Sequence, residues 1–210
     1  MNQLLLNIPA FAGATLLLVM VPGQGVAMVL KQSITGGSKA ALLSAFGNCA
    51  GIFLWSISSA IGLSAIFTQS QLAYSLLKWT GVAFLVLVSL QTAFALRKEF
   101  GTFDLDGTKQ PSNWASFRLG LITNLTNVKA AVYAVAFLPA FVPREFSLAW
   151  GIMIFGSIWA IVSICWNLFL IWTVKKSSTY IQRPIVRRTL TAISALGIMG
   201  LALGLAFSGS

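Results

Sequence analysis

The 210-residue sequence has no histidine, two cysteines and only four acidic residues. Without histidine, both Cys/His zinc sites and imidazole-based acid–base catalysis are excluded. Charged residues make up 9% of the chain, whereas a soluble domain has about 25%. A chain that is 57% hydrophobic and so poor in charge cannot cover a soluble globule with polar surface. We therefore expect an integral membrane protein.

Long apolar stretches recur along the whole chain. A transmembrane helix needs about 20 apolar residues. Six stretches reach this length: residues 8–30, 41–67, 72–96, 117–141, 147–174 and 189–208. No basic segment precedes the first stretch, so we interpret it as a retained span rather than a cleaved signal peptide. The sequence predicts an all-α integral membrane protein with six transmembrane helices in a single domain, residues 1–210.

The net charge of +10 collects in three of the predicted connections. The first, third and fifth connections and their flanks hold Lys31, Lys39, Arg97, Lys98, Lys109, Arg118, Lys175, Lys176, Arg183, Arg187 and Arg188. Because cytoplasmic loops accumulate Lys and Arg, we expect these connections in the cytoplasm and both termini outside. No basic face interleaved with aromatic residues is present, so we expect no nucleic-acid partner.

Two predicted spans are interrupted. The first contains VPGQG at residues 21–25, where proline removes a backbone hydrogen bond and glycine loosens the helix. The fourth contains TNLTNVK at residues 123–129. If the half-repeats 1–96 and 117–210 are related, they form a 3+3 inverted repeat joined by the cytoplasmic connection 97–116. Breaks at matching positions then indicate a binding site near the midplane, and a kink that serves packing alone is the alternative.

Lys129 lies in the middle of the fourth predicted span, about 18 Å of helix from either end. A charged lysine at that depth costs about 2.5–3.5 kcal/mol. The four acids, Glu99, Asp104, Asp106 and Glu145, all lie in connections or at their edges. A negative partner for Lys129 must then come from outside the chain, and a substrate carboxylate is the obvious candidate.

Three stretches of this sequence resemble the LysE superfamily of amino-acid exporters. They are VPGQGVAMVLKQSITGGSKAALLSAFGNCAGIF at residues 21–53, FRLGLITNLTNVKAAVYAVAFLPAFV at 117–142 and VRRTLTAISALGIMGLALGLAF at 186–207. The second stretch is most similar to the RhtB branch, the homoserine/threonine exporters. The chain departs from the family pattern at both breaks, because Gln24 and Val128 stand where the family usually has proline. Without these second prolines we expect gentler helix breaks than in the family, and a substrate or coupling that differs from the family's.

The resemblance implies an amino-acid efflux antiporter in the bacterial cytoplasmic (inner) membrane rather than an enzyme. Its partners are amino acids or related small zwitterions, protons and the lipid bilayer, and we expect no cofactor and no metal. The expected substrate-binding residues are Pro22, Gly23, Gln24, Asn48, Asn124, Asn127, Lys129 and Asn167. Lys129 would bind the carboxylate, while freed carbonyls and amide oxygens would accept from the ammonium group. The predicted spans contain no Asp, Glu or His, so Lys129 is also the candidate for proton coupling.

Alternatives to an exporter remain open from sequence alone. Cys49 and Cys165 fall at similar depths in their spans, which permits an intramembrane thiol-redox relay, although buried cysteine commonly serves as a small hydrophobe. A non-transporting relative or scaffold is a further alternative. Metal export would need thiolate, imidazole or carboxylate ligands that the spans lack.

Two further motifs have limited meaning. DLDGT at residues 104–108 matches a phosphatase signature, but it lies in a polar connection without the hydrophobic strand that such a site requires. Gly47 and Gly51 give the second span a small-xxx-small face, which lets helices approach closely. That contact lies either within one chain or between subunits, so a homodimer is possible.

Overall fold

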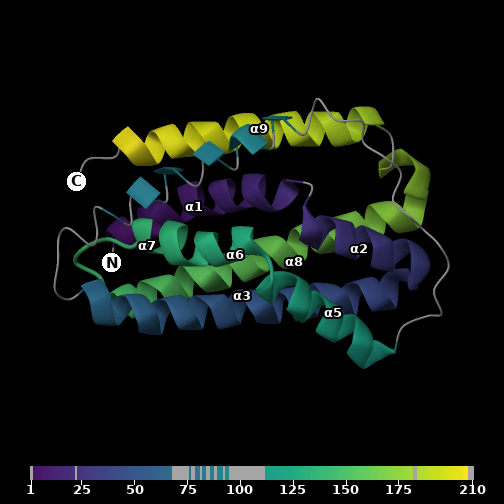
Figure 1. Ribbon diagram of the computed structural model, residues 1–210, viewed down its shortest axis with the longest axis horizontal. Helices are drawn as coiled ribbons and strands as arrows, with labels where there is room; N and C mark the ends of the chain where they lie inside the picture. Colours follow the sequence, from purple (N-terminus) through teal and green to yellow (C-terminus); the bar gives the residue numbers. More distant parts are fainter. Residues whose placement is uncertain are drawn as a thin grey trace.

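The computed structural model describes residues 2–21, 23–67, 112–181 and 184–207, together with scattered positions between 76 and 94. Within these ranges every regular element is helical (Figure 1). The elements are α1 (Asn2–Met20), α2 (Gln24–Thr35), α3 (Gly37–Phe67), α5 (Asn113–Leu125), α6 (Val128–Val132), the π-helix η1 (Tyr133–Phe137), α7 (Leu138–Ala140), α8 (Leu148–Ile181) and α9 (Pro184–Phe207). The expected all-α class is confirmed for this part of the chain.

Three described helices are long and apolar enough to cross a membrane: Gln3–Met20, Gly37–Gly62 and Leu148–Lys176. A fourth span is possible if the bent pair Asn113–Leu125 and Val128–Ala140 crosses as one unit, with a bend of 59° between its parts. Most of the predicted third span, 72–96, and the DLDGT motif lie outside the described residues. The six-span inverted repeat therefore stays a prediction.

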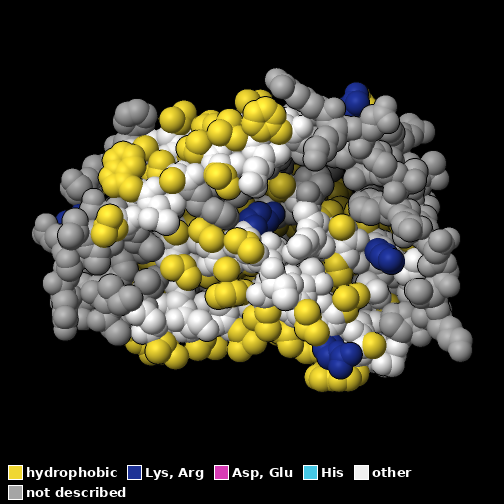
Figure 2. Space-filling view, viewed as in Figure 1, with side chains coloured by type: hydrophobic (Ala, Val, Ile, Leu, Met, Phe, Trp, Pro, Cys, Tyr) yellow, Lys and Arg dark blue, Asp and Glu magenta, His cyan; other side chains and the backbone are white. Residues whose placement is uncertain are grey.

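The described surface suits a lipid environment. On the face shown in Figure 2 the side chains are mostly hydrophobic, with isolated basic side chains among them. The long helices run along one axis, and both chain termini lie at one end of it (Figure 1). The α2–α3 junction, the start of α5 and the end of α8 lie at the other end. Lys31, Lys39, Lys175 and Lys176 belong to the elements that meet at this second end.

The first crossing helix begins earlier than residue 8, where the sequence predicted its start. The helix α1 already contains Asn2, Gln3 and Asn7. The reason is tertiary contact: Leu4 is buried in the main core, and the Asn7 amide donates to the carbonyl of Phe141 over 2.8 Å. A polar residue whose hydrogen bond is satisfied by a neighbouring segment can continue an apolar helix.

Both predicted helix breaks are present. α1 ends at Met20 and α2 begins at Gln24, with Gly23 extended between them. α5 ends at Leu125 and α6 begins at Val128. Here the Asn127 side chain caps α6 by accepting from the backbone N–H of Lys129 over 3.1 Å. Asparagine is a favoured cap residue, which accounts for its position in an otherwise apolar segment.

α3 and α5 approach so closely that their backbones nearly touch. A Cβ added to Gly47 would collide with the carbonyl of Phe117, and one added to Gly120 with the carbonyl of Ser44. A Cβ on Gly51 would meet the side chain of Asn124. The small-xxx-small face is therefore used within the chain, and it no longer argues for a homodimer. This crossing also holds Asn124 against α3, where the cavity described below begins.

An aromatic cluster fills the core on the side of the termini. Phe11 packs against Phe155 at a centroid distance of 4.7 Å, and Tyr133 packs on Phe137 at 4.6 Å and on Trp159 at 4.8 Å. Buried hydroxyls join α1 to η1, because Thr15 and Tyr133 share a hydrogen bond of 2.6 Å. Trp159, at one edge of the cluster, also lines the cavity described below.

Candidate functional site

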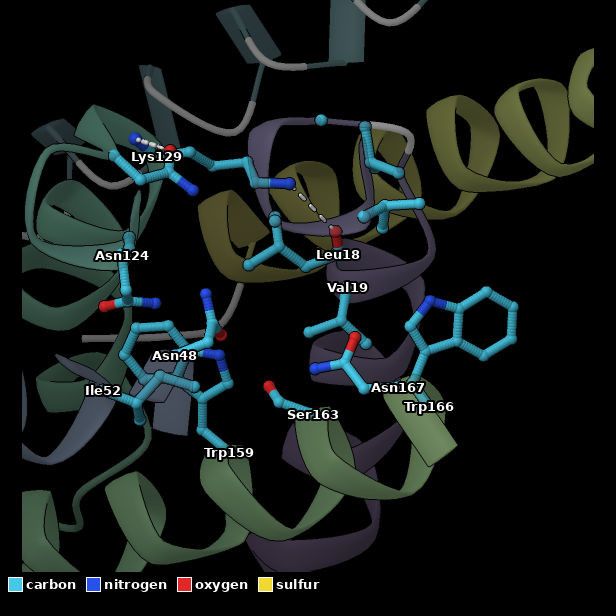
Figure 3. Close-up of a pocket in the computed structure, with 16 residues that line it drawn as sticks. Leu18, Val19, Asn48, Ile52, Asn124, Lys129, Trp159, Ser163, Trp166 and Asn167 are labelled. Atoms are coloured by element: carbon cyan, nitrogen blue, oxygen red, sulfur yellow. Dashed lines mark hydrogen bonds between the residues drawn. The ribbon is translucent and has the colours of Figure 1, made fainter. Parts of the chain in front are cut away.

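A small cavity lies where the two helix breaks meet (Figure 3). Its volume is about 60 Å³, which is room for a few water molecules at about 10–15 Å³ each. The wall combines the end of α1, the start of α2, the α5–α6 break and faces of α3 and α8. The lining residues are Leu18, Val19, Val21, Gly23, Gly25, Val26, Asn48, Ile52, Asn124, Asn127, Lys129, Ala130, Trp159, Ser163, Trp166 and Asn167.

Lys129 crosses from one break to the other. Its Nζ donates to the carbonyl of Leu18 over 3.2 Å, the contact drawn in Figure 3. Leu18 belongs to the last turn of α1, where carbonyls carry partial negative charge, and its carbonyl also accepts from the backbone N–H of Val21 over 3.3 Å. The break in the first half thus supplies an acceptor to the lysine of the second half. This bond joins residues 111 positions apart.

Within the described ranges, no carboxylate is placed to neutralise Lys129. Of the four acids only Glu145 falls in these ranges, and it is exposed in the turn between α7 and α8. Gly23 lies on the other side of the ammonium group, since a Cβ built on it would be 3.7 Å from Nζ. The cation therefore faces a cavity with one helix-end carbonyl as its acceptor in this part of the chain.

Three polar atoms at the cavity have no hydrogen-bond partner: Asn124 Oδ1, Ser163 Oγ and Trp166 Nε1. Asn124 is 3% exposed and Ser163 4%. Most buried polar groups in proteins are paired, so unpaired atoms around a cavity indicate a place for water or a ligand. Asn124 Oδ1 packs beside Gly51 of α3, away from the other cavity residues (Figure 3). The unpaired groups of the cavity wall are therefore the Ser163 hydroxyl and the Trp166 indole N–H, beside the ammonium group of Lys129.

α8 presents Trp159, Ser163, Trp166 and Asn167 to the cavity. Their spacing of four, three and one places them on one helix face. The expected site residues included Asn167 but not Trp159, Ser163 or Trp166. The spacing of Trp159, Ser163 and Asn167 was the signal that could have identified this face.

Six of the eight expected site residues line the same cavity: Gly23, Asn48, Asn124, Asn127, Lys129 and Asn167. Asn127 has an additional role, because its oxygen already caps α6 and so positions Lys129. Gln24 does not line this cavity. It is exposed at the start of α2 and lines a separate groove, since one residue turns a helix by about 100°. Pro22 lies outside the described residues.

The two cysteines are not joined in the structure. Cys49 is buried in α3 and its Sγ donates to the carbonyl of Ala160 over 3.7 Å. Cys165 is exposed on α8, and both thiols are free. The geometry gives the thiol-relay alternative no support.

Comparison with known proteins gives the following matches. Residues 16–209 match the family described as "LysE type translocator". The chain is 24% identical over 209 residues to "Uncharacterized membrane protein YrhP" of Bacillus subtilis, covering 95% of this chain and 96% of that protein. It is 32% identical over 142 residues to "Homoserine/homoserine lactone efflux protein" of Salmonella typhimurium, covering 67% of each. No solved structure matches the chain.

Proposed function

The chain belongs to the LysE type translocator family, which makes it a membrane transporter and not an enzyme, and from this premise we propose what it carries and how. The proposed cargo is an amino acid or a closely related small zwitterion, moved from the cytoplasm to the outside. The Salmonella relative is named for homoserine and homoserine lactone, so neutral hydroxylated amino acids are the first candidates.

The position of Lys129 carries this proposal. Its ammonium group faces a cavity where the helix-end carbonyl of Leu18 is its acceptor. A substrate carboxylate supplies the missing negative charge, and a hydrogen bond between ionised groups is stronger than one between neutral groups. The substrate's ammonium group binds Ser163 Oγ, an unpaired oxygen of the cavity wall. Trp166 Nε1 is then free to donate to a polar substrate side chain.

The proposed topology has six spans in an inverted repeat, both termini outside, within the bacterial cytoplasmic membrane. Three observations support it. The termini lie at one end of the long axis and the lysine-bearing junctions at the other (Figure 1). The two breaks occupy matching places in the two halves. They also meet at one cavity, as expected for a site at the interface between repeats.

The proposed coupling is antiport with protons through Lys129. Proton pathways through membranes commonly use Asp, Glu or His, and the predicted spans contain none of these. A charged group at the cavity between the halves is thus the best-placed carrier.

Efflux from preloaded proteoliposomes across an amino-acid panel, with an imposed pH gradient, tests the function. We expect gradient-dependent release of a few neutral amino acids by the wild type and its loss in Lys129→Met. Lys39→Met removes the same charge at an exposed position away from the cavity and should behave as wild type. Release that is unaffected by Lys129→Met would keep the exporter and reject the role of Lys129. No release of any panel member by the wild type would reject the exporter.

A further inference from the structure

A second hollow, a groove of about 350 Å³, lies between α2 and α5. On α2 its wall consists of Gln24, Met28, Lys31 and Gln32. These residues are spaced four, three and one apart, so they form one face of the helix over about 12 Å. The groove therefore follows α2 along most of its length.

α5 supplies the opposite wall with the same periodicity, through Leu119, Thr123 and Thr126. The two helices run in opposite directions, because α2 leaves its break and α5 approaches its own. One end of the groove thus lies at Lys31 and Gln32, among the lysine-bearing elements. The other end lies at Gln24 and Thr126, beside the two breaks.

The inner end of the groove adjoins the central cavity in sequence and in space. Gln24 stands between Gly23 and Gly25, which both line the cavity. Thr126 likewise precedes Asn127, another cavity residue. Neighbouring residues of the chain thus line the two hollows at this point.

The groove has the chemistry for a zwitterion. Gln32 lines the groove and is only 7% exposed, and its Oε1 lies beside Gly36 without a hydrogen-bond partner. A turn of this side chain towards the groove would supply an acceptor for an ammonium group. Lys31 next to it is exposed and offers an ammonium group to a carboxylate. Polar side chains inside membrane proteins generally face the interior or a water-filled path, which fits a groove lined by Gln24, Thr123 and Thr126 as well.

The central cavity and the groove differ in volume. The central cavity, at about 60 Å³, holds a few waters, whereas the groove reaches the lower end of the size range of ligand pockets. In this structure only the groove, of these two, has room for a whole amino acid.

We propose that the α2–α5 groove is the cytoplasmic entry site, where the zwitterion binds before it passes between Gln24 and Thr126 to Lys129. Lys31 holds its carboxylate and Gln32 Oε1 accepts from its ammonium group. The inference rests on the proposed export function. It adds a second, outlying binding site for the same class of substrate.

Uptake of labelled homoserine into inside-out membrane vesicles tests the entry site, because these vesicles present the cytoplasmic face to the medium. We expect Lys31→Gln and Gln32→Leu to raise the KM about tenfold, the loss of one charged hydrogen bond, while the maximal rate stays near wild type. Lys39→Gln, an equally exposed lysine outside the groove, should leave the KM unchanged. Gln32→Glu keeps an acceptor and should restore the low KM.

The results that would reject the entry site differ from those that would reject the exporter. An unchanged KM in both groove variants, or an equal rise in Lys39→Gln, overturns the entry site while wild-type uptake still supports the exporter. A wild type that takes up no panel substrate rejects the proposed function, and the entry site with it. If Lys31→Gln alters only the maximal rate, and only with anionic lipids in the vesicle, the groove holds a lipid headgroup and the inference is wrong.

A labelling experiment covers the case in which Gln32→Leu does not insert into the membrane. Thr123→Cys in a Cys49→Ser, Cys165→Ser background places one thiol in the groove. We expect a membrane-impermeant thiol reagent to modify it from the cytoplasmic side, and saturating homoserine to slow that reaction several-fold. Modification at the same rate with and without homoserine contradicts occupation of the groove.

Discussion

Lys129 connects two parts of the chain that the sequence gives no local reason to join. It belongs to α6, is positioned by the Asn127 cap and binds the carbonyl of Leu18 at the end of α1. A partly buried lysine at membrane depth without a described carboxylate is costly, and such residues in membranes are commonly functional. The role of Lys129 is therefore best tested by changing the substrate group that it is proposed to bind.

Homoserine and its lactone distinguish the carboxylate contact from the amine contact in the proposed binding mode. The lactone has the amine but no free carboxylate. In counterflow, which needs no gradient, Lys129→Met should reduce homoserine exchange by about tenfold or more, the loss of a charged hydrogen bond. Lactone exchange should fall much less, since Ser163 still accepts from its amine. Equal losses for both compounds would refute the pairing of Lys129 with the carboxylate.

At the scale of elements, the sequence predicted the breaks because their causes are local. Pro22 and Gly23 disrupt a helix wherever they occur, and asparagine is a known cap. The start of α1 could not be predicted, because Asn7 is satisfied by Phe141, far along the chain. Gln24 was placed in the cavity for a similar reason: its direction depends on the phase at which α2 restarts after the break, which composition does not reveal.

The crossing of α3 and α5 gives a stability prediction. Gly47→Ala pushes a methyl group into the backbone of α5, and overpacking of this kind costs about 1–3 kcal/mol. Gly62→Ala lies on the same helix with open space around it, so it should be neutral or raise stability by about 0.5–1 kcal/mol. Thermal unfolding in detergent measures both. Equal midpoints for the two variants would show that the close crossing is not needed for stability.

At the scale of the whole molecule, orientation rests on where the basic residues lie relative to the termini. In a cysteine-free background, Arg144→Cys lies in the turn between α7 and α8, towards the proposed outside. It should react with an impermeant thiol reagent in intact cells, while Lys39→Cys should react only after permeabilisation. The reverse pattern would invert the topology, and with it the direction of transport.

The bond between Lys129 and Leu18 also bears on leak. An exporter without bound substrate must not leak ions, because a leak would dissipate the gradient that drives transport. With the site empty, this contact ties the end of α1 in the first half to α6 in the second. In the proposed binding mode, a substrate carboxylate competes with Leu18 for the ammonium group. The atom that recognises the cargo is thus also the one that joins the two halves in the structure.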